Sequence, residues 1–161
     1  MKNNKVESSE LMQLVGFKLG DEEFGVDISK VQEINRIMTI TKIPNSQNYI
    51  EGVVNLRGRI IPIMNLRSRL GMGKKENDAR TKIIVADING TLVAFIVDEV
   101  TEVLRIAQET IEDTPAIATN VEQEFITGIA NLDDRLLMLL NLDKVYQPVD
   151  TKKLQEVEQT Y

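Results

Sequence analysis

The sequence predicts an all-β protein in which one module occurs twice. Short β-branched runs alternate with Gly-containing turns along the chain, a pattern that is typical of antiparallel hairpins. The segment 49–66 recurs as 125–142 with seven identical residues in eighteen positions, and the segment 26–37 recurs as 95–106 with four in twelve. Two copies are too few for a solenoid. Paired small barrels or sheets are expected instead, because closure removes the exposed edges of short antiparallel strands.

Size and composition indicate a single globular domain with few groups suited to catalysis. The chain has 161 residues, of which 42% are hydrophobic, and this is enough to bury a core. It contains no cysteine and no histidine, so disulfides, thiolate metal sites and the commonest general base are absent. No apolar run reaches membrane-spanning length and the polar start lacks a signal-peptide core, which fits a cytoplasmic protein. A net charge of −6 argues against nucleic-acid binding.

The first half is expected to form two hairpins joined by a short connector. Residues 1–10 are polar and are expected to be flexible. Strands are expected at 11–19, 23–28 and, more weakly, 39–42. Ser29 and Gln32 have the spacing of a capping box, so a helical turn is expected to begin at Ser29. The second hairpin turns at Arg57-Gly58, and because Pro62 has no N–H its strand is expected at an edge or bulged.

The second half repeats this order after a helical turn that follows Asn65 and a link that contains Gly and Lys. Asn89-Gly90 joins two apolar strands and is the strongest short hairpin signal in the chain. Asp87 follows an apolar strand as the phosphoacceptor of a receiver domain does, but a second strand comes next where that fold needs a helix. The offset between the copies grows from 69 to 76 residues, so the insertion falls in the loops around 107–123. The tail 148–161 is expected to form a short amphipathic helix.

Charge is unevenly spread along the chain. From Gly52 to Lys75 there are six basic residues and no acidic one, so this segment carries a charge of +6. Because the net charge of the whole chain is −6, the other residues together carry −12. Such a segment is either a solvated basic face or a docking surface, where complementary charge sets orientation and encounter rate. A group of acidic residues in the second half offers an enzymatic alternative through acid–base or Mg²⁺ chemistry, although surface charge is the commoner role: Asp98, Glu99, Glu102, Asp133 and Asp134.

Arg57 is a candidate binding residue because the duplication does not explain it. A turn does not require arginine, and the equivalent residue of the second copy is Asp133. Arginine binds carboxylates in a bidentate manner and is enriched at binding hot spots. Glu33 and Val31 lie in the connector of the same half and would add an acidic and an apolar contact, although Glu33 also fits a simple surface charge. Residues that recur in both copies are interpreted as formers of turns and bends: Asn55, Asn65, Asn131, Asn141, Gly52 and Gly128.

Three segments of the chain resemble the CheW-type coupling proteins of bacterial chemotaxis. They are GDEEFGVDISKVQEI (20–34), EGVVNLRGRIIPIMNLR (51–67) and FITGIANLDDRLLMLLNLDKV (125–145), and the N-L-R-G-x-I-x-P hairpin is specific. The resemblance covers nearly the whole chain. It implies a single domain over 11–147, made of two pseudo-symmetric, five-stranded, SH3-like β-barrels around a shared hydrophobic core. The first barrel is expected at 17–80 and the second at 11–16 with 81–147.

The resemblance also implies a function without catalysis and without a cofactor. Such proteins bridge the cytoplasmic hairpin tip of a chemoreceptor to the C-terminal regulatory domain of the chemotaxis histidine kinase, without inserting into the membrane. Receptor contact is expected in the groove between the barrels, at Val31, Glu33, Gly52, Arg57, Gly58 and Arg59. Kinase contact is expected on outer strands, with no residue assigned. Two alternatives stay open, namely an adaptor of the same fold in another two-component pathway such as pilus motility, and a small carboxylate- or metal-dependent enzyme.

Overall fold

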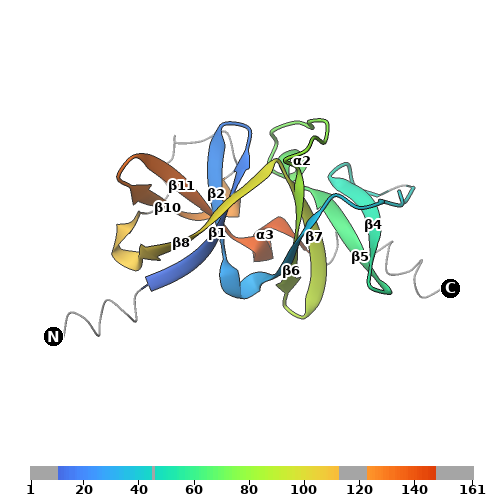
Figure 1. Ribbon diagram of the computed structural model, residues 1–161, viewed down its shortest axis with the longest axis horizontal. Coiled ribbons are helices and arrows are strands. Elements are labelled where there is room, and N and C mark those ends of the chain that lie inside the picture. The colour runs from blue at the N-terminus through green and yellow to red at the C-terminus, as the bar shows by residue number, and fades with distance from the viewer. Residues whose placement is uncertain (1–10, 45, 113–122, 148–161) are drawn as a thin grey trace.

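A computed structural model describes residues 11–44, 46–112 and 123–147, in which strands predominate and helices are single turns (Figure 1). The first repeat contains β1 (Leu11–Leu19), β2 (Glu22–Asp27), η1 (Ile28–Lys30), β3 (Val31–Arg36), β4 (Ile50–Leu56), β5 (Arg59–Asn65) and α2 (Leu66–Arg69). The second contains β6 (Lys82–Ile88), β7 (Thr91–Val97), β8 (Glu99–Ala107), η2 (Gln108–Thr110), β9 (Ile111–Glu112), η3 (Gln123–Phe125), β10 (Ile126–Leu132), β11 (Arg135–Leu140) and α3 (Leu142–Val145). The predicted all-β class is confirmed.

Two expectations concern the ends of the given sequence, and a third concerns membrane-spanning helices. The predicted flexibility of 1–10 and the predicted helix in 148–161 lie outside the described residues. Within the described ranges, every helix is too short or too polar to cross a membrane.

The strands form two sheets, and each sheet contains strands from both repeats. Sheet A has the order β8-β1-β2-β11-β10-β9 and sheet B the order β3-β6-β7-β5-β4; they lie side by side, with α3 between them (Figure 1). The β1–β2 hairpin of the first repeat therefore pairs with strands of the second, and the β6–β7 hairpin of the second pairs with strands of the first. Each sheet therefore combines strands of both repeats, and the predicted barrels, 17–80 and 11–16 with 81–147, stay a prediction. The SH3-like barrel geometry remains a prediction.

The later hairpins of the two repeats, β4–β5 and β10–β11, share a local irregularity. Each has a shift of register near the start of its first strand, between Ile50 and Gly52 in one and between Ile126 and Gly128 in the other. These positions are equivalent in the 76-residue offset between the copies. The sequence duplication is therefore also a duplication of backbone geometry.

A hydrophobic core is shared by the two sheets. Its largest cluster includes Phe17 and Phe24 from sheet A and Met64 and Phe95 from sheet B, each at most 1% exposed. The rings of Phe17 and Phe24 stack with their centroids 5.7 Å apart and their planes inclined by 17°. Burying a side chain of this size stabilises the fold by roughly 1.5–3 kcal/mol. Because these residues come from both sheets, the core holds the sheets together, as predicted.

The connector between β2 and β3 differs from the predicted capping box. The helical turn is η1, and its N-cap is Asp27, whose carboxylate accepts a hydrogen bond from Ser29 N at 2.9 Å. Val31 then begins a strand in which half-buried and exposed residues alternate. A short helical turn is therefore present, as expected, but it begins at Ile28 with Asp27 as its cap, and it ends at Lys30 because the strand β3 follows. The segment 39–42 forms no named strand and contributes one isolated bridge, between Thr41 and Val53.

Pro62 lies in an internal strand, which corrects the expectation of an edge position. β5 pairs with β4 on one side and with β7 on the other, but its pairing with β7 begins only at Ile63. Opposite Pro62, Val53 donates its N–H to Thr41 O at 2.9 Å, away from β5. Val53 and Pro62 are thus a non-hydrogen-bonded pair, so the missing N–H removes no ladder bond.

Candidate functional site

The β4–β5 turn holds Arg57 in an unfavourable backbone conformation. Arg57 has a φ of 50° and Gly58 a φ of 87°, which are the two positive values of a type I′ turn. Glycine or asparagine is favoured at the first of these positions, as Asn89 with a φ of 53° shows in the β6–β7 turn. For other residues the left-handed region costs roughly 1–2 kcal/mol. Asn55 accepts a hydrogen bond from Gly58 N at 2.8 Å, which confirms its predicted role in the turn.

Arg57 and Glu33 form a bidentate ion pair between opposite edges of sheet B. Glu33 lies on edge strand β3 and Arg57 follows the other edge strand, β4, so the sheet curls until its edges meet. Arg57 Nη1 donates to Glu33 Oε1 at 3.1 Å and Nη2 donates to Oε2. Asn35 Nδ2 also donates to Oε1, at 3.1 Å. The hydrogen bonds from Arg57 hold the pKa of Glu33 below its usual 4.5, and Glu33 raises the pKa of Arg57.

The two members of this pair differ in exposure. The Glu33 side chain is 20% exposed, whereas that of Arg57 is 69% exposed. A guanidinium has five N–H donors, and Glu33 occupies two of them. Glu33 therefore fixes the orientation of Arg57 while leaving donors available to a partner.

The other predicted residues lie around this pair with different surroundings. Gly58 and Arg59 are exposed beside Arg57, and Val31 is half-buried against the shared core. Gly52 is buried with a φ of 145°, and an added Cβ would overlap the Thr41 carbonyl oxygen. The structure thus brings five of the six residues to the surface or half-buried edge of sheet B and gives Gly52 a role in backbone packing. Their role in receptor binding stays a prediction.

The second repeat has a carboxylate–guanidinium contact at the equivalent place. Glu102, the equivalent of Glu33, accepts a hydrogen bond from Arg135 Nη2 at 3.1 Å. The same guanidinium donates from Nε to Glu23 Oε1 and from Nη1 to Asp134 Oδ1, each at 3.0 Å. These contacts, that with Glu23 above all, raise the pKa of Arg135. One cation faces three carboxylates here, so this end of sheet A is acidic where the corresponding end of sheet B is basic.

Three of the five acidic residues of the enzymatic alternative are engaged in ion pairs with arginines. Glu102 and Asp134 bind Arg135, while Asp98 binds Arg67. Among the residues that the structure describes, no group of three carboxylates is placed to hold a metal ion. The geometry therefore gives no support to carboxylate- or metal-dependent chemistry at this place.

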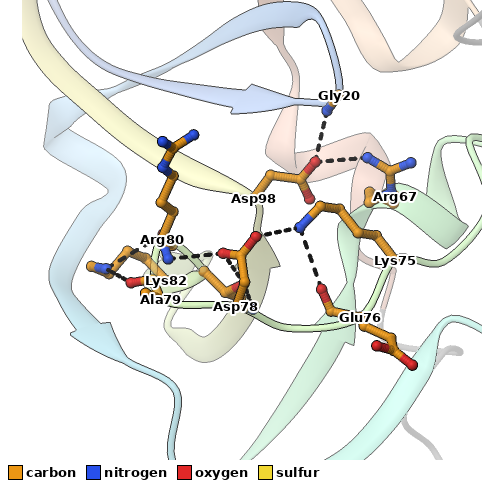
Figure 2. Close-up of polar contacts among 10 residues, drawn as sticks. Gly20, Arg67, Lys75, Glu76, Asp78, Ala79, Arg80, Lys82 and Asp98 are labelled. Carbon is orange, nitrogen blue, oxygen red and sulfur yellow. Dashed lines mark hydrogen bonds and ion pairs between the residues drawn. The ribbon is translucent and has the colours of Figure 1, made fainter.

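The basic segment does not form one continuous docking face. Arg57 and Arg59 are exposed at the turn, but the Arg67 side chain is only 18% exposed. Arg67 Nη1 donates to Asp98 Oδ2 at 2.7 Å, and Gly20 N donates to the same oxygen at 2.7 Å (Figure 2). Asp98 belongs to the second repeat, so Arg67 joins the repeats. The docking interpretation therefore applies to the turn and not to the whole segment.

The loop between the repeats is organised by Asp78. Its carboxylate accepts from Lys75 Nζ at 2.8 Å and from Arg80 N at 2.8 Å (Figure 2). These bonds, that from Lys75 first, lower the pKa of Asp78 to about 2. Thr81, at the end of the loop, is buried and accepts from Asp78 N at 2.8 Å. The loop is thus tied to the start of β6.

Lys30 and Asp143 form a second contact between the repeats, with inverted charges. Asp143 is equivalent to Arg67, and Lys30 is equivalent to Glu99, the neighbour of Asp98. Lys30 Nζ lies 3.8 Å from Asp143 Oδ1, and both side chains are more than one-third exposed. Exposure weakens such a pair through screening. The short helix of each repeat is nonetheless linked to the other repeat by an ion pair.

A cavity of about 220 Å³ lies between the repeats beside this second ion pair. The first repeat contributes residues of β1, β2 and η1, and the second contributes residues of β10, β11 and α3. The lining includes Leu14, Asp27, Lys30, Leu140, Leu142 and Asp143. Small-molecule sites usually span roughly 300–1,000 Å³, so this cavity is better suited to side chains of a partner protein. The six predicted receptor residues are not part of this lining, although Lys30 directly precedes Val31 in the chain. Sequence reasoning missed the cavity because its walls come from separate hairpins.

Fold and site together define a duplicated two-sheet β-protein whose exposed chemistry is that of protein docking. The model of the CheW-like domain family matches residues 13–149. The chain therefore belongs to the CheW-like domain family, which confirms the resemblance carried by the three segments. This is a family of chemotaxis adaptor and scaffolding proteins.

Individual relatives match most of their own length. The chain is 37% identical over 140 residues to the probable chemotaxis protein CheW of Rhizobium etli, covering 87% of this chain and 90% of that protein. It is 39% identical over 129 residues to the chemotaxis protein CheW of Klebsiella aerogenes, covering 80% and 78%. The crystal structure of the scaffolding protein TtCheW from Thermoanaerobacter tengcongensis matches with a TM-score of 0.78 and 38% identity, covering 84% of this chain and 88% of that one.

Proposed function

We propose that this chain is a non-catalytic, cytoplasmic adaptor that couples the cytoplasmic tip of a chemoreceptor to the chemotaxis histidine kinase. The receptor tip contacts the basic end of sheet B, at Val31, Glu33, Arg57, Gly58 and Arg59, with Gly52 holding the backbone beneath, and it also contacts the cavity beside Lys30. The regulatory domain of the kinase contacts outer strands. No cofactor takes part.

The observation that carries this proposal is the placement of Arg57. A positive φ is costly for arginine, and asparagine or glycine would make the same turn without that cost. An observed backbone outlier of this kind is a reason to infer function at the residue. Glu33 orients the guanidinium, whose side chain is mostly exposed. An oriented, accessible arginine is a typical centre for a protein interface.

Exposed apolar side chains support the presence of two separate docking faces. Ile34 and Ile60 are 41% and 52% exposed on sheet B, and their equivalents Val103 and Leu136 are 55% and 59% exposed on sheet A. Apolar residues beside ion-paired arginines match the mixed character of reversible interfaces. Because one face is basic and the other acidic, the two faces are suited to different partners.

Binding of a soluble chemoreceptor hairpin fragment tests the proposal. Arg57→Asp should weaken binding by about 30-fold, equivalent to about 2 kcal/mol for a hot-spot residue. Arg80→Asp is the matched control, because it makes the same charge reversal at an exposed loop residue outside the site. Circular dichroism should show that both variants are folded like the parent protein, and binding is compared below the unfolding temperature of Arg57→Asp, which loses the partly exposed pair with Glu33.

Reconstitution with the kinase tests the coupling itself. Receptor fragment, kinase and this protein should form a ternary assembly that is lost when this protein is left out. Glu33→Lys should weaken receptor binding and spare kinase binding. Receptor binding unchanged by Arg57→Asp would remove Arg57 from the site, and ternary assembly without this protein would reject the proposed function.

A further inference from the structure

Arg69, the last residue of α2, reaches from the first repeat into the second. Its guanidinium carbon lies 4.4 Å from the ring centroid of Tyr49 and 5.1 Å from that of Phe125. Its Nε donates a hydrogen bond to Val145 O at 2.8 Å. Tyr49 belongs to the first repeat, whereas Phe125 and Val145 belong to the second. A single side chain therefore contacts an aromatic ring of each repeat and the backbone of the second.

The partners of Arg69 are equivalent residues of the duplication. Phe125 follows Tyr49, and Val145 follows Arg69, by the same 76 residues. The backbone around the two rings is also equivalent, because Tyr49 O accepts from Asn65 N at 2.7 Å and Phe125 O accepts from Asn141 N at 2.9 Å. Arg69 thus lies where the two copies face each other. The second repeat has valine at this position, so it cannot make the reciprocal contact.

The bond to Val145 anchors a wall of the cavity. α3 has four residues, too few to be stable as an isolated helix, so its position depends on tertiary contacts. Leu142 and Asp143 at its start line the cavity, and Val145 at its end is fully buried. Asp143 also contacts Lys30. A displacement of α3 would therefore change the cavity and the ion pair together.

We propose that Arg69 is a positioning residue that sets the spacing of the two repeats and thereby the shape of the cavity on the receptor side. The planar guanidinium suits this role because it stacks on rings and donates a directed hydrogen bond, whereas a lysine ammonium cannot do both with the same geometry. The link to receptor binding rests on the proposed function above. The structural part, the spacing of the repeats, does not.

The spacing can be measured in the absence of any partner. The chain has no cysteine, so Arg36→Cys on β3 of the first repeat and Asp133→Cys at the β10–β11 turn of the second repeat place one spin label on each repeat, and on each sheet, at exposed positions. Double electron–electron resonance should show a broader or shifted distance distribution in Arg69→Met. Arg69→Lys, which keeps the charge, should give an intermediate distribution. Arg80→Met, which removes an exposed arginine outside the junction, should leave the distribution unchanged.

Receptor binding of the same variants tests the positioning role. At a temperature where all variants are folded, Arg69→Met should bind the receptor fragment about tenfold more weakly, Arg69→Lys should recover part of the loss, and kinase binding should be retained. An unchanged distance distribution in Arg69→Met would overturn the inference whatever the receptor data show. A changed distance distribution with unchanged receptor binding would overturn the positioning role. If Arg57→Asp leaves receptor binding unchanged, that result contradicts the proposed function and not the spacing role of Arg69.

Discussion

Replacing Gly52 with alanine should separate the segment after β3 from β4. The added Cβ would overlap the Thr41 carbonyl oxygen and lie 2.9 Å from Lys42 Cα, and backbone atoms cannot rotate away as a flexible side chain can. Relief requires moving Thr41, which breaks its two backbone hydrogen bonds with Val53, each 2.9 Å long. At roughly 0.5–1.5 kcal/mol per bond and about 1–3 kcal/mol for a non-glycine residue at this φ, the free energy of unfolding should fall by about 2–6 kcal/mol.

Chemical denaturation followed by circular dichroism measures this loss. Gly71→Ala is the matched control, because Gly71 has a φ of 80° and no atom lies within 4 Å of its added Cβ. That variant reports the backbone contribution alone, about 1 kcal/mol. A Gly52→Ala protein no less stable than the Gly71→Ala protein would refute the argument from the Thr41 contact.

Two further predictions concern the Glu33–Arg57 pair and the helix caps. The folded-state pKa of Glu33 lies below 4.5, so the stabilisation from its pair with Arg57 is complete above that pH and is lost as pH falls through the lowered pKa. An NMR titration of the Glu33 carboxyl should show this pKa rising towards 4.5 in Arg57→Met; an identical titration in both proteins would contradict the pairing. Asn65 caps α2 by accepting a hydrogen bond from Ser68 N at 3.0 Å, and Asn141 caps α3 by accepting one from Asp143 N at 3.1 Å. Asn65 differs from Asn141 because it is only 6% exposed and also donates a hydrogen bond to Glu51 Oε2 at 3.2 Å. Asn65→Ala should therefore cost about 2 kcal/mol in unfolding free energy and Asn141→Ala about 1 kcal/mol, and equal losses would show that the additional contact contributes nothing.

The hairpins were predictable because each is specified by neighbouring residues. Arg57-Gly58 and Asn89-Gly90 mark turns that need positive φ, and both turns have it. The order of strands within the sheets was not predictable in this way. Nothing local to β2 shows that it pairs with β11 in place of the strands that follow it in sequence. The helical turn expected near Ser29 is present as η1, but its cap is Asp27 and it ends at Lys30 because Val31 pairs with β6, a strand distant in sequence.

The residues of the candidate site likewise fall into those that the sequence indicates and those that only the three-dimensional structure shows. The sequence indicates Arg57 as a binding residue because the equivalent residue of the second copy is Asp133, and it offers Glu33 as an acidic contact nearby. The structure brings the two side chains into contact. Arg67 and Arg69 belong to the basic segment that the sequence offers as a docking surface, but in the structure both join the repeats. A signal was present for Arg69, because aligning the copies places this arginine against Val145. An arginine where the duplicate has an aliphatic residue indicates a contact that only one copy makes.

The exchange of hairpins between the sheets also sets an order of events during synthesis. Sheet B is complete once the ribosome has released β7, which ends at Val97, whereas sheet A must wait for β11, which ends at Leu140. The β1–β2 hairpin precedes the other strands of sheet A in the chain, yet β2 gains its neighbour β11 only after the remaining strands have been made. Chains stalled in the second repeat would present unpaired strand edges, which are prone to aggregation. Nor would cutting the loop at 71–81 release two autonomous halves, since each fragment would retain strands whose hydrogen-bonding partners had left with the other.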